Sequence, residues 1–134
     1  MTENKWPEKV GISITNLQQA FSRLELFLEK PIEDERDQAG VIQAFEFTYE
    51  LFWKTFQKIA QSQGLQAQSP KQALQAAFQL DFVHAEEEQL WLEIMEDRNR
   101  TVHTYQKELA QQIFERIRDQ YFEAFGKCLG RLVD

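Results

Sequence analysis

Cysteine, proline and glycine are scarce in this sequence, with one, three and five residues of each kind among 134. A single cysteine, Cys128, excludes an internal disulfide and is compatible with a reducing cytoplasm. Because Cys128 lies in an apolar helical pattern, we expect a buried structural thiol and not a nucleophile. The scarcity of glycine and proline favours long helices joined by short connections.

Long apolar runs are also missing, and positive charge is in the minority. No run approaches the roughly 20 apolar residues that span a bilayer, and residues 1–7 lack the apolar segment of a signal peptide. We therefore expect a cytoplasmic protein without membrane contact. The net charge of −7 argues against a protein that coats DNA, which needs a broad basic surface, but it leaves room for a small basic site.

The length and the apolar content of 43% predict one globular domain over residues 1–134, with residues 1–12 as an N-terminal arm. Apolar residues at steps of three and four predict a first helix from the N-cap Ser13 to Pro31. Acidic residues 33–37 open a second helix that ends before Gly64. Ser69 followed by Pro70 opens a third.

A fourth helix is expected over the apolar residues that precede residue 98, and a fifth from Thr104 to the C-terminus. No stretch alternates long enough for a strand. The fold class is therefore all-α, an up-and-down antiparallel bundle of about five helices. The second helix carries aromatic residues on more than one face, which indicates that it is central or shared between two copies: Phe45, Phe47, Tyr49, Phe52, Trp53 and Phe56. We expect a homodimer.

The densest group of chemically active side chains lies in residues 97–105. Arg98 and His103 are five residues apart, roughly 140° on an unbroken helix, so they share a face only if the helix ends between them or a second subunit completes the site. An arginine holds a phosphate and a histidine transfers protons near neutral pH, which suits phosphodiester chemistry without a metal. Two alternatives remain: an ion pair of Arg98 with Glu50, and a His103 that bonds backbone.

A metal site near His84 is not favoured by the sequence. Three glutamates follow His84, but acidic residues at a helix N-terminus are the expected complement of the helix dipole. No other histidine or cysteine is placed to complete a tetrahedral set. We expect no metal and no cofactor.

The order of these motifs resembles a known family. Arg98-x4-His103-x-Tyr105 is similar to the R-x4-H-x-Y motif of HepT-type toxins in the HEPN superfamily. The surrounding pieces also resemble the nucleotidyltransferase substrate-binding proteins, over nearly the whole chain from Ile14. These pieces are Phe45-Glu46, Glu50-Leu51-x-Trp53-Lys54, Ser69-Pro70-Lys71, Ala77-Phe78, Trp91 and Asp97-Arg98-Asn99.

The HepT resemblance implies a metal-independent endoribonuclease that cuts RNA as a homodimer. Arg98 would clamp the phosphate and His103 would transfer the proton. Asn99 would orient either group, and Arg100 would steer RNA or pair with an acid. The resemblance further implies that a cognate small nucleotidyltransferase, an MntA-like antitoxin, transfers AMP to Tyr105. The alternative is a non-catalytic substrate-binding or interaction subunit of that nucleotidyltransferase.

Overall fold

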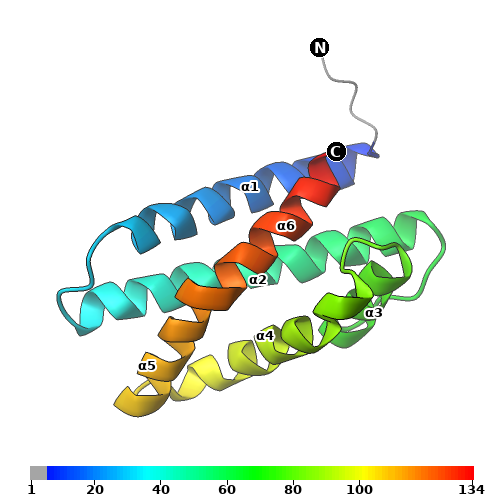
Figure 1. Cartoon of the computed structure of the whole chain (residues 1–134). Helices are drawn as coiled ribbons and strands as arrows, with labels where there is room; N and C mark the ends of the chain where they lie inside the picture. Colours follow the sequence, from blue (N-terminus) through cyan, green and yellow to red (C-terminus); the bar gives the residue numbers. More distant parts are fainter. Residues whose placement is uncertain (1–5) are drawn as a thin grey trace.

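The computed structural model describes residues 6–134, and within that range the chain is helical without strands (Figure 1). The long helices are α1 (Glu8–Glu29), α2 (Glu35–Ser62), α3 (Pro70–Gln79), α4 (Glu88–Arg100), α5 (Lys107–Arg116) and α6 (Phe122–Val133). A π-helical turn, Ile117–Tyr121, joins α5 and α6 into one continuous helix. Short 3₁₀ turns, Ala85–Glu87 and Thr101–His103, flank α4. The all-α antiparallel bundle predicted from the sequence is confirmed.

Three helix ends follow the local signals in the sequence. The Asp34 carboxylate accepts a hydrogen bond from the Asp37 backbone N–H (3.0 Å) at the start of α2. Gly64 follows α2 with a φ of +76°, a conformation that glycine adopts without steric cost. The Ser69 hydroxyl accepts from the Gln72 N–H (3.2 Å), with Pro70 at the first helical position. Short-range capping therefore fixes both boundaries of the α2–α3 loop.

The expected start of the first helix at Ser13 is wrong, and the expected N-terminal arm does not extend to residue 12, since residues 8–12 are helical. The helix α1 already begins at Glu8, and residues 1–5 of the arm lie outside the described part of the chain. Ser13 is buried inside α1, where its hydroxyl lies 2.6 Å from that of Thr55 on α2. Trp6 packs back onto the body: its indole N–H donates to the Leu132 carbonyl (2.9 Å), so the start of α1 lies beside the C-terminus (Figure 1).

The expected start of the fifth helix at Thr104 is also wrong, because α5 begins at Lys107. The Thr104 hydroxyl does not cap α5. It donates to the Thr101 carbonyl (2.8 Å) and so closes the preceding 3₁₀ turn. The chain consequently passes from α4 to α5 through a two-part turn.

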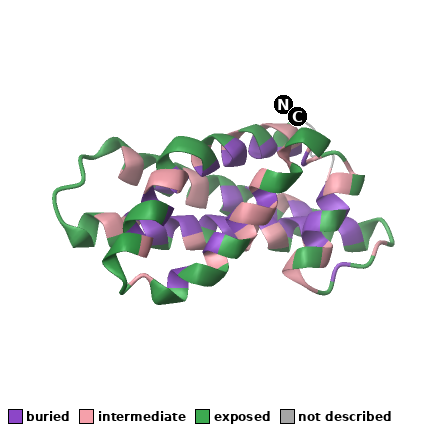
Figure 2. Cartoon of the chain, turned by 60° about the horizontal axis from the view of Figure 1, so that its bottom comes forward, coloured by how far each residue is buried: buried purple, intermediate pink, exposed green. Residues whose placement is uncertain are grey.

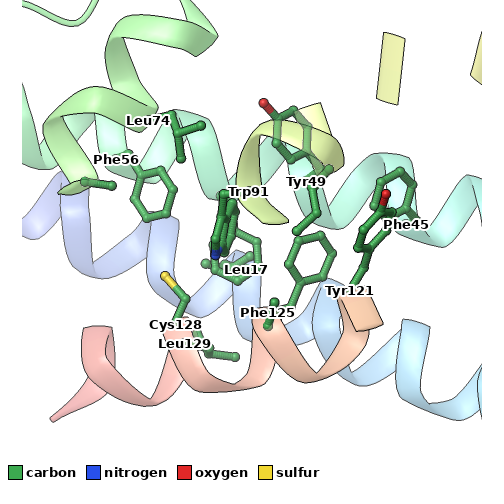
Figure 3. Close-up of a cluster of buried hydrophobic side chains, with 14 of the residues drawn as sticks. Leu17, Phe45, Tyr49, Phe56, Leu74, Trp91, Tyr121, Phe125, Cys128 and Leu129 are labelled. Atoms are coloured by element: carbon green, nitrogen blue, oxygen red, sulfur yellow. The ribbon is translucent and has the colours of Figure 1, made fainter. Parts of the chain in front are cut away.

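The core is built around α2, as its aromatic residues predict. Phe45, Phe52 and Phe56 are buried, and Phe45, Phe56 and Trp91 belong to one cluster of buried side chains (Figure 3). The ring of Phe52 packs edge-on against Trp91, with the two centroids 5.4 Å apart. Buried and exposed residues alternate around the helices (Figure 2). Among the aromatic residues of α2, Phe47 differs from the buried ones, with 56% of its surface exposed. The central position of α2 thus accounts for most of its aromatics within one copy, and the homodimer remains a prediction.

Two further expectations concern single features of the chain. Cys128 is buried, and burial raises the pKa of its thiol, which confirms a structural thiol. No helix within residues 6–134 is both long and apolar enough to cross a membrane.

Candidate functional site

The motif begins with a buried carboxylate. The side chain of Asp97 is fully buried and accepts hydrogen bonds from Arg116 (Nε, 2.7 Å), from Arg100 (2.9 Å) and from the Tyr121 hydroxyl. The π-helical turn ends at Tyr121. Burial alone would raise the pKa of the Asp97 carboxyl, but the hydrogen bonds from Arg116, Tyr121 and Arg100 hold it below its usual range. We call these four residues the Asp97 network.

Arg100 belongs to this network and not to an open site. Its second amino group also contacts the Glu96 carboxylate at 3.2 Å. Of the two roles expected for Arg100, steering RNA or pairing with an acid, the structure shows the second.

Arg98, the next residue after Asp97, has a different set of partners. One of its amino groups lies 3.1 Å from the Glu46 carboxylate and donates to the Thr101 hydroxyl at 3.0 Å. Thr101 donates in turn to Glu46 at 2.7 Å. Arg98 therefore forms an ion pair with α2, but its partner is Glu46 and not the expected Glu50. Glu46 lies one helical turn earlier on α2, while Glu50 pairs with Lys54 at 3.8 Å.

A surface cleft of about 540 Å³ lies beside Arg98. Three segments form it: the middle of α2, the first turn of α3, and the end of α4 with the turn that follows. Its lining residues are Tyr49, Glu50, Trp53, Ser69, Pro70, Lys71, Met95, Arg98, Asn99 and Val102. We call it the Arg98 cleft.

Two residues of this cleft carry buried, unsatisfied donors. The Tyr49 side chain is 3% exposed, and its hydroxyl has no hydrogen-bond partner among residues 6–134. The Arg98 Nε is buried and lacks a partner in the same way. Burial raises the pKa of the Tyr49 phenol, so the hydroxyl keeps its proton at neutral pH. Figure 3 shows this hydroxyl turned away from the ring cluster around Trp91 and Phe125.

His103 and Tyr105 form a second group. The helix ends between Arg98 and His103, which is one of the two conditions given for a shared face, because α4 ends at Arg100 and a 3₁₀ turn carries the chain through His103. The His103 Nδ1 lies 3.4 Å from the Tyr105 hydroxyl, and their rings meet edge-on. Neither residue lines the Arg98 cleft. Tyr105, 76% exposed, lines a separate cleft of about 330 Å³ between α5 and the start of α2.

Within one copy, the structure therefore brings Arg98 together with Asn99, and His103 together with Tyr105. Sequence reasoning missed Tyr49 and Lys71 as members of the site. The signal for Tyr49 was its spacing of four from Trp53, which puts both on one helical face. No local signal connected Lys71 to Arg98, because their proximity depends on how α3 packs.

The part of the chain that the structure describes contains no group of three or more His, Cys, Asp or Glu able to hold a metal ion. The Nδ1 of His84 lies 3.7 Å from the Glu86 carboxylate. Glu87 accepts from the His84 backbone N–H (2.9 Å) and pairs with Arg131 at 2.6 Å. These acids thus serve the start of α4 and an ion pair with α6.

Comparison with known proteins matches residues 12–134 to a family model described as nucleotidyltransferase substrate binding protein like. A protein of Thermus thermophilus, known from its crystal structure, is similar in sequence and fold. The two are 34% identical, with a TM-score of 0.79 over 88% of this chain and 99% of the other. No curated protein matches at a significant level.

Proposed function

Because this chain belongs to the nucleotidyltransferase substrate binding protein like family, we propose that it is the substrate-binding subunit of a small nucleotidyltransferase. The chain holds a substrate in the Arg98 cleft, and the partner enzyme supplies the nucleotide, the metal and the transfer chemistry.

One observation carries this proposal: the sequence segments that resemble the nucleotidyltransferase substrate-binding proteins meet at one cleft. Glu50 and Trp53, Ser69 to Lys71, and Arg98 with Asn99 come from three distant parts of the chain, and all of them line the same cleft. A packing role would place such segments in the core. These residues instead surround an accessible space with two cationic groups, an indole ring and a helix start, which is the composition of a ligand site.

The test is reconstitution with a small nucleotidyltransferase, sought first among the neighbouring reading frames. The two proteins, co-expressed with a tag on one, are expected to elute together in size-exclusion chromatography, and the pair transfers a labelled nucleotide that neither protein transfers alone. Lys71→Ala is expected to lower transfer without breaking the complex. The matched control is Lys127→Ala, an exposed lysine on α6 outside the cleft lining, which leaves transfer unchanged. Separate elution of the two proteins would contradict the proposal.

A second candidate function, RNA cleavage by Arg98 and His103, is supported by the exposed imidazole of His103 beside the end of α4. Because His103 does not line the Arg98 cleft, we expect the reaction to need a dimer in which His103 of one protomer approaches Arg98 of the other. The isolated protein would then cleave RNA in EDTA, and His103→Ala would lower the rate about 10²–10⁴-fold. His84→Ala is the control, and absence of cleavage by the dimer rules the activity out.

The partner enzyme also has an accessible acceptor on this chain. The Tyr105 hydroxyl is exposed and lies next to the His103 Nδ1, which would take the phenolic proton. The oxygen would attack the α-phosphorus of ATP, forming a phosphodiester to AMP and releasing pyrophosphate. Intact-mass spectrometry after co-expression is expected to show an AMP adduct that is lost in Tyr105→Phe. An unmodified wild-type chain would eliminate this reaction.

A further inference from the structure

Two lining residues of the Arg98 cleft carry unpaired donors, and the inference drawn from them rests on the proposed function because it concerns the same site. Tyr49 and Arg98 both line the cleft, and neither the Tyr49 hydroxyl nor the Arg98 Nε has an acceptor among residues 6–134. Buried donors are nearly always paired in folded proteins. Arginine nitrogen only donates, so the missing group is an acceptor.

The surrounding charges define that acceptor further. The first turn of α3 borders the cleft, and its backbone N–H groups lack carbonyl partners within the helix. Pro70 has no N–H, and the Gln72 N–H is capped by the Ser69 hydroxyl, which leaves the Lys71 N–H in that turn. The Lys71 ammonium and the helix dipole add positive potential. Glu50, the one acidic residue in the lining, pairs with Lys54 at 3.8 Å. An oxyanion fits this set of donors.

The walls of the cleft are apolar. Trp53 is four residues from Tyr49, about 6 Å along the axis of α2. Met95 and Val102 line the same space from α4 and the turn after it. A flat apolar group next to the oxyanion would cover the half-buried indole.

We propose that the Arg98 cleft binds a small ligand with an oxyanion bonded to the Tyr49 hydroxyl and the Arg98 Nε, and a flat ring packed against Trp53. A phosphate monoester or a carboxylate supplies the same acceptor oxygens. Tyr49 is thus a binding residue for the substrate, although its side chain is almost entirely buried.

Binding of simple probes to the isolated protein tests this site, with isothermal titration calorimetry as the readout. The probes are inorganic phosphate, phenyl phosphate, benzoate and benzyl alcohol. Phenyl phosphate is expected to bind more tightly than phosphate, and benzyl alcohol not to bind. Benzoate binding as tightly as phenyl phosphate assigns the oxyanion to a carboxylate, and weaker binding assigns it to a phosphate. Binding of benzyl alcohol equal to that of phenyl phosphate would overturn the proposal.

Two tyrosine variants separate binding from stability. Tyr49→Phe removes a hydroxyl without a partner among the described residues, so the fold is retained while phenyl phosphate affinity falls about tenfold or more. Tyr121→Phe is the matched control, since it removes a hydroxyl bonded to Asp97 and Glu93; it lowers the thermal midpoint and leaves affinity unchanged. Trp53→Ala is expected to abolish the advantage of phenyl phosphate over phosphate.

Unchanged affinity in a folded Tyr49→Phe protein overturns the assignment of Tyr49, and absence of any probe binding overturns the site. Both results are obtained without the partner enzyme. A chain that binds phenyl phosphate but no nucleotidyltransferase would refute the proposed function and leave this site standing. A chain that binds a nucleotidyltransferase but no phenyl phosphate would refute this site and leave the proposed function standing.

Discussion

Asp97 and Arg98 are adjacent in the sequence and belong to opposite kinds of structure. Asp97 is fully buried, and three side chains donate to its carboxylate. Arg98 is half-buried beside a cleft, and its Nε has no acceptor within residues 6–134. The Asp97 carboxylate holds α4 against the α5–α6 helix. Arg98 is paired with Glu46 and Thr101 through one amino group, and we propose that its unpartnered Nε binds a ligand. Adjacent charged residues can therefore have different roles, one in stabilising the fold and one in lining a cleft. Only the contacts of each side chain distinguish these roles.

The largest expected effect comes from removing the charge of Asp97. Asp97→Asn removes the nearer of two carboxylates beside the partly buried Arg116 Nε, since Asp97 lies at 2.7 Å and Glu93 at 3.3 Å. Loss of one member of a buried pair costs about 3–5 kcal/mol. Urea unfolding followed by circular dichroism measures the loss. A change below about 1 kcal/mol would mean that the network contributes little to the fold.

Acid should remove the same contribution in the wild-type protein. The folded-state pKa of Asp97 is lowered, so its stabilisation is fully present above the unfolded value of about 3.9 and is lost as pH falls through the folded value. Urea midpoints between pH 7 and pH 2 are expected to decline below about pH 4, and less steeply in Asp97→Asn. Equal slopes in both proteins would exclude Asp97 as the source.

A smaller loss is expected for Tyr121→Phe. The variant removes a neutral donor to the Asp97 carboxylate, and hydrogen bonds to charged groups are worth about 1.5–3 kcal/mol. Thermal and urea unfolding should agree on the loss. Stability equal to that of the wild type would show that the Arg116 and Arg100 contacts alone satisfy Asp97.

The smallest effect on stability is expected for Tyr49→Phe. This variant also removes one tyrosine hydroxyl, but from a residue of α2 that lines the Arg98 cleft. Because the Tyr49 hydroxyl has no partner among the described residues, its removal should change the free energy of unfolding by less than about 0.5 kcal/mol. A loss as large as that of Tyr121→Phe would reveal a structural role for this hydroxyl and remove the contrast between the two sides.

The sequence predicted those features that depend on neighbouring residues. Capping by Ser69 and the end of α2 at Gly64 involve contacts within a few positions, so their signals are local. Ser13 has the same local appearance, but its hydroxyl pairs with Thr55, 42 residues away. Glu46 and Glu50 lie one helical turn apart on α2. Which of them contacts Arg98 depends on how α2 packs along α4, and the sequence does not show this. The π-helical turn at residues 117–121 had no local signal at all.

The candidate site was predicted in part for the same reason. Arg98 and Asn99 were found because a motif marks them, whereas Tyr49 resembles an ordinary core aromatic. Only the packed structure shows that its hydroxyl is unsatisfied and that Tyr49 lines the same cleft as Arg98. The dimer and the roles of His103 and Tyr105 remain predictions, since they require a second molecule.

Hydrogen exchange by mass spectrometry, on the protein alone and with saturating phenyl phosphate, tests most directly whether the Arg98 cleft is the functional site. Ligand-dependent protection is expected in the three segments that line the cleft, residues 49–53, 69–71 and 95–102, and not in the exposed start of α5. Protection confined to residues 35–42 and 104–111, around Tyr105, would contradict the account and place the site in the other cleft.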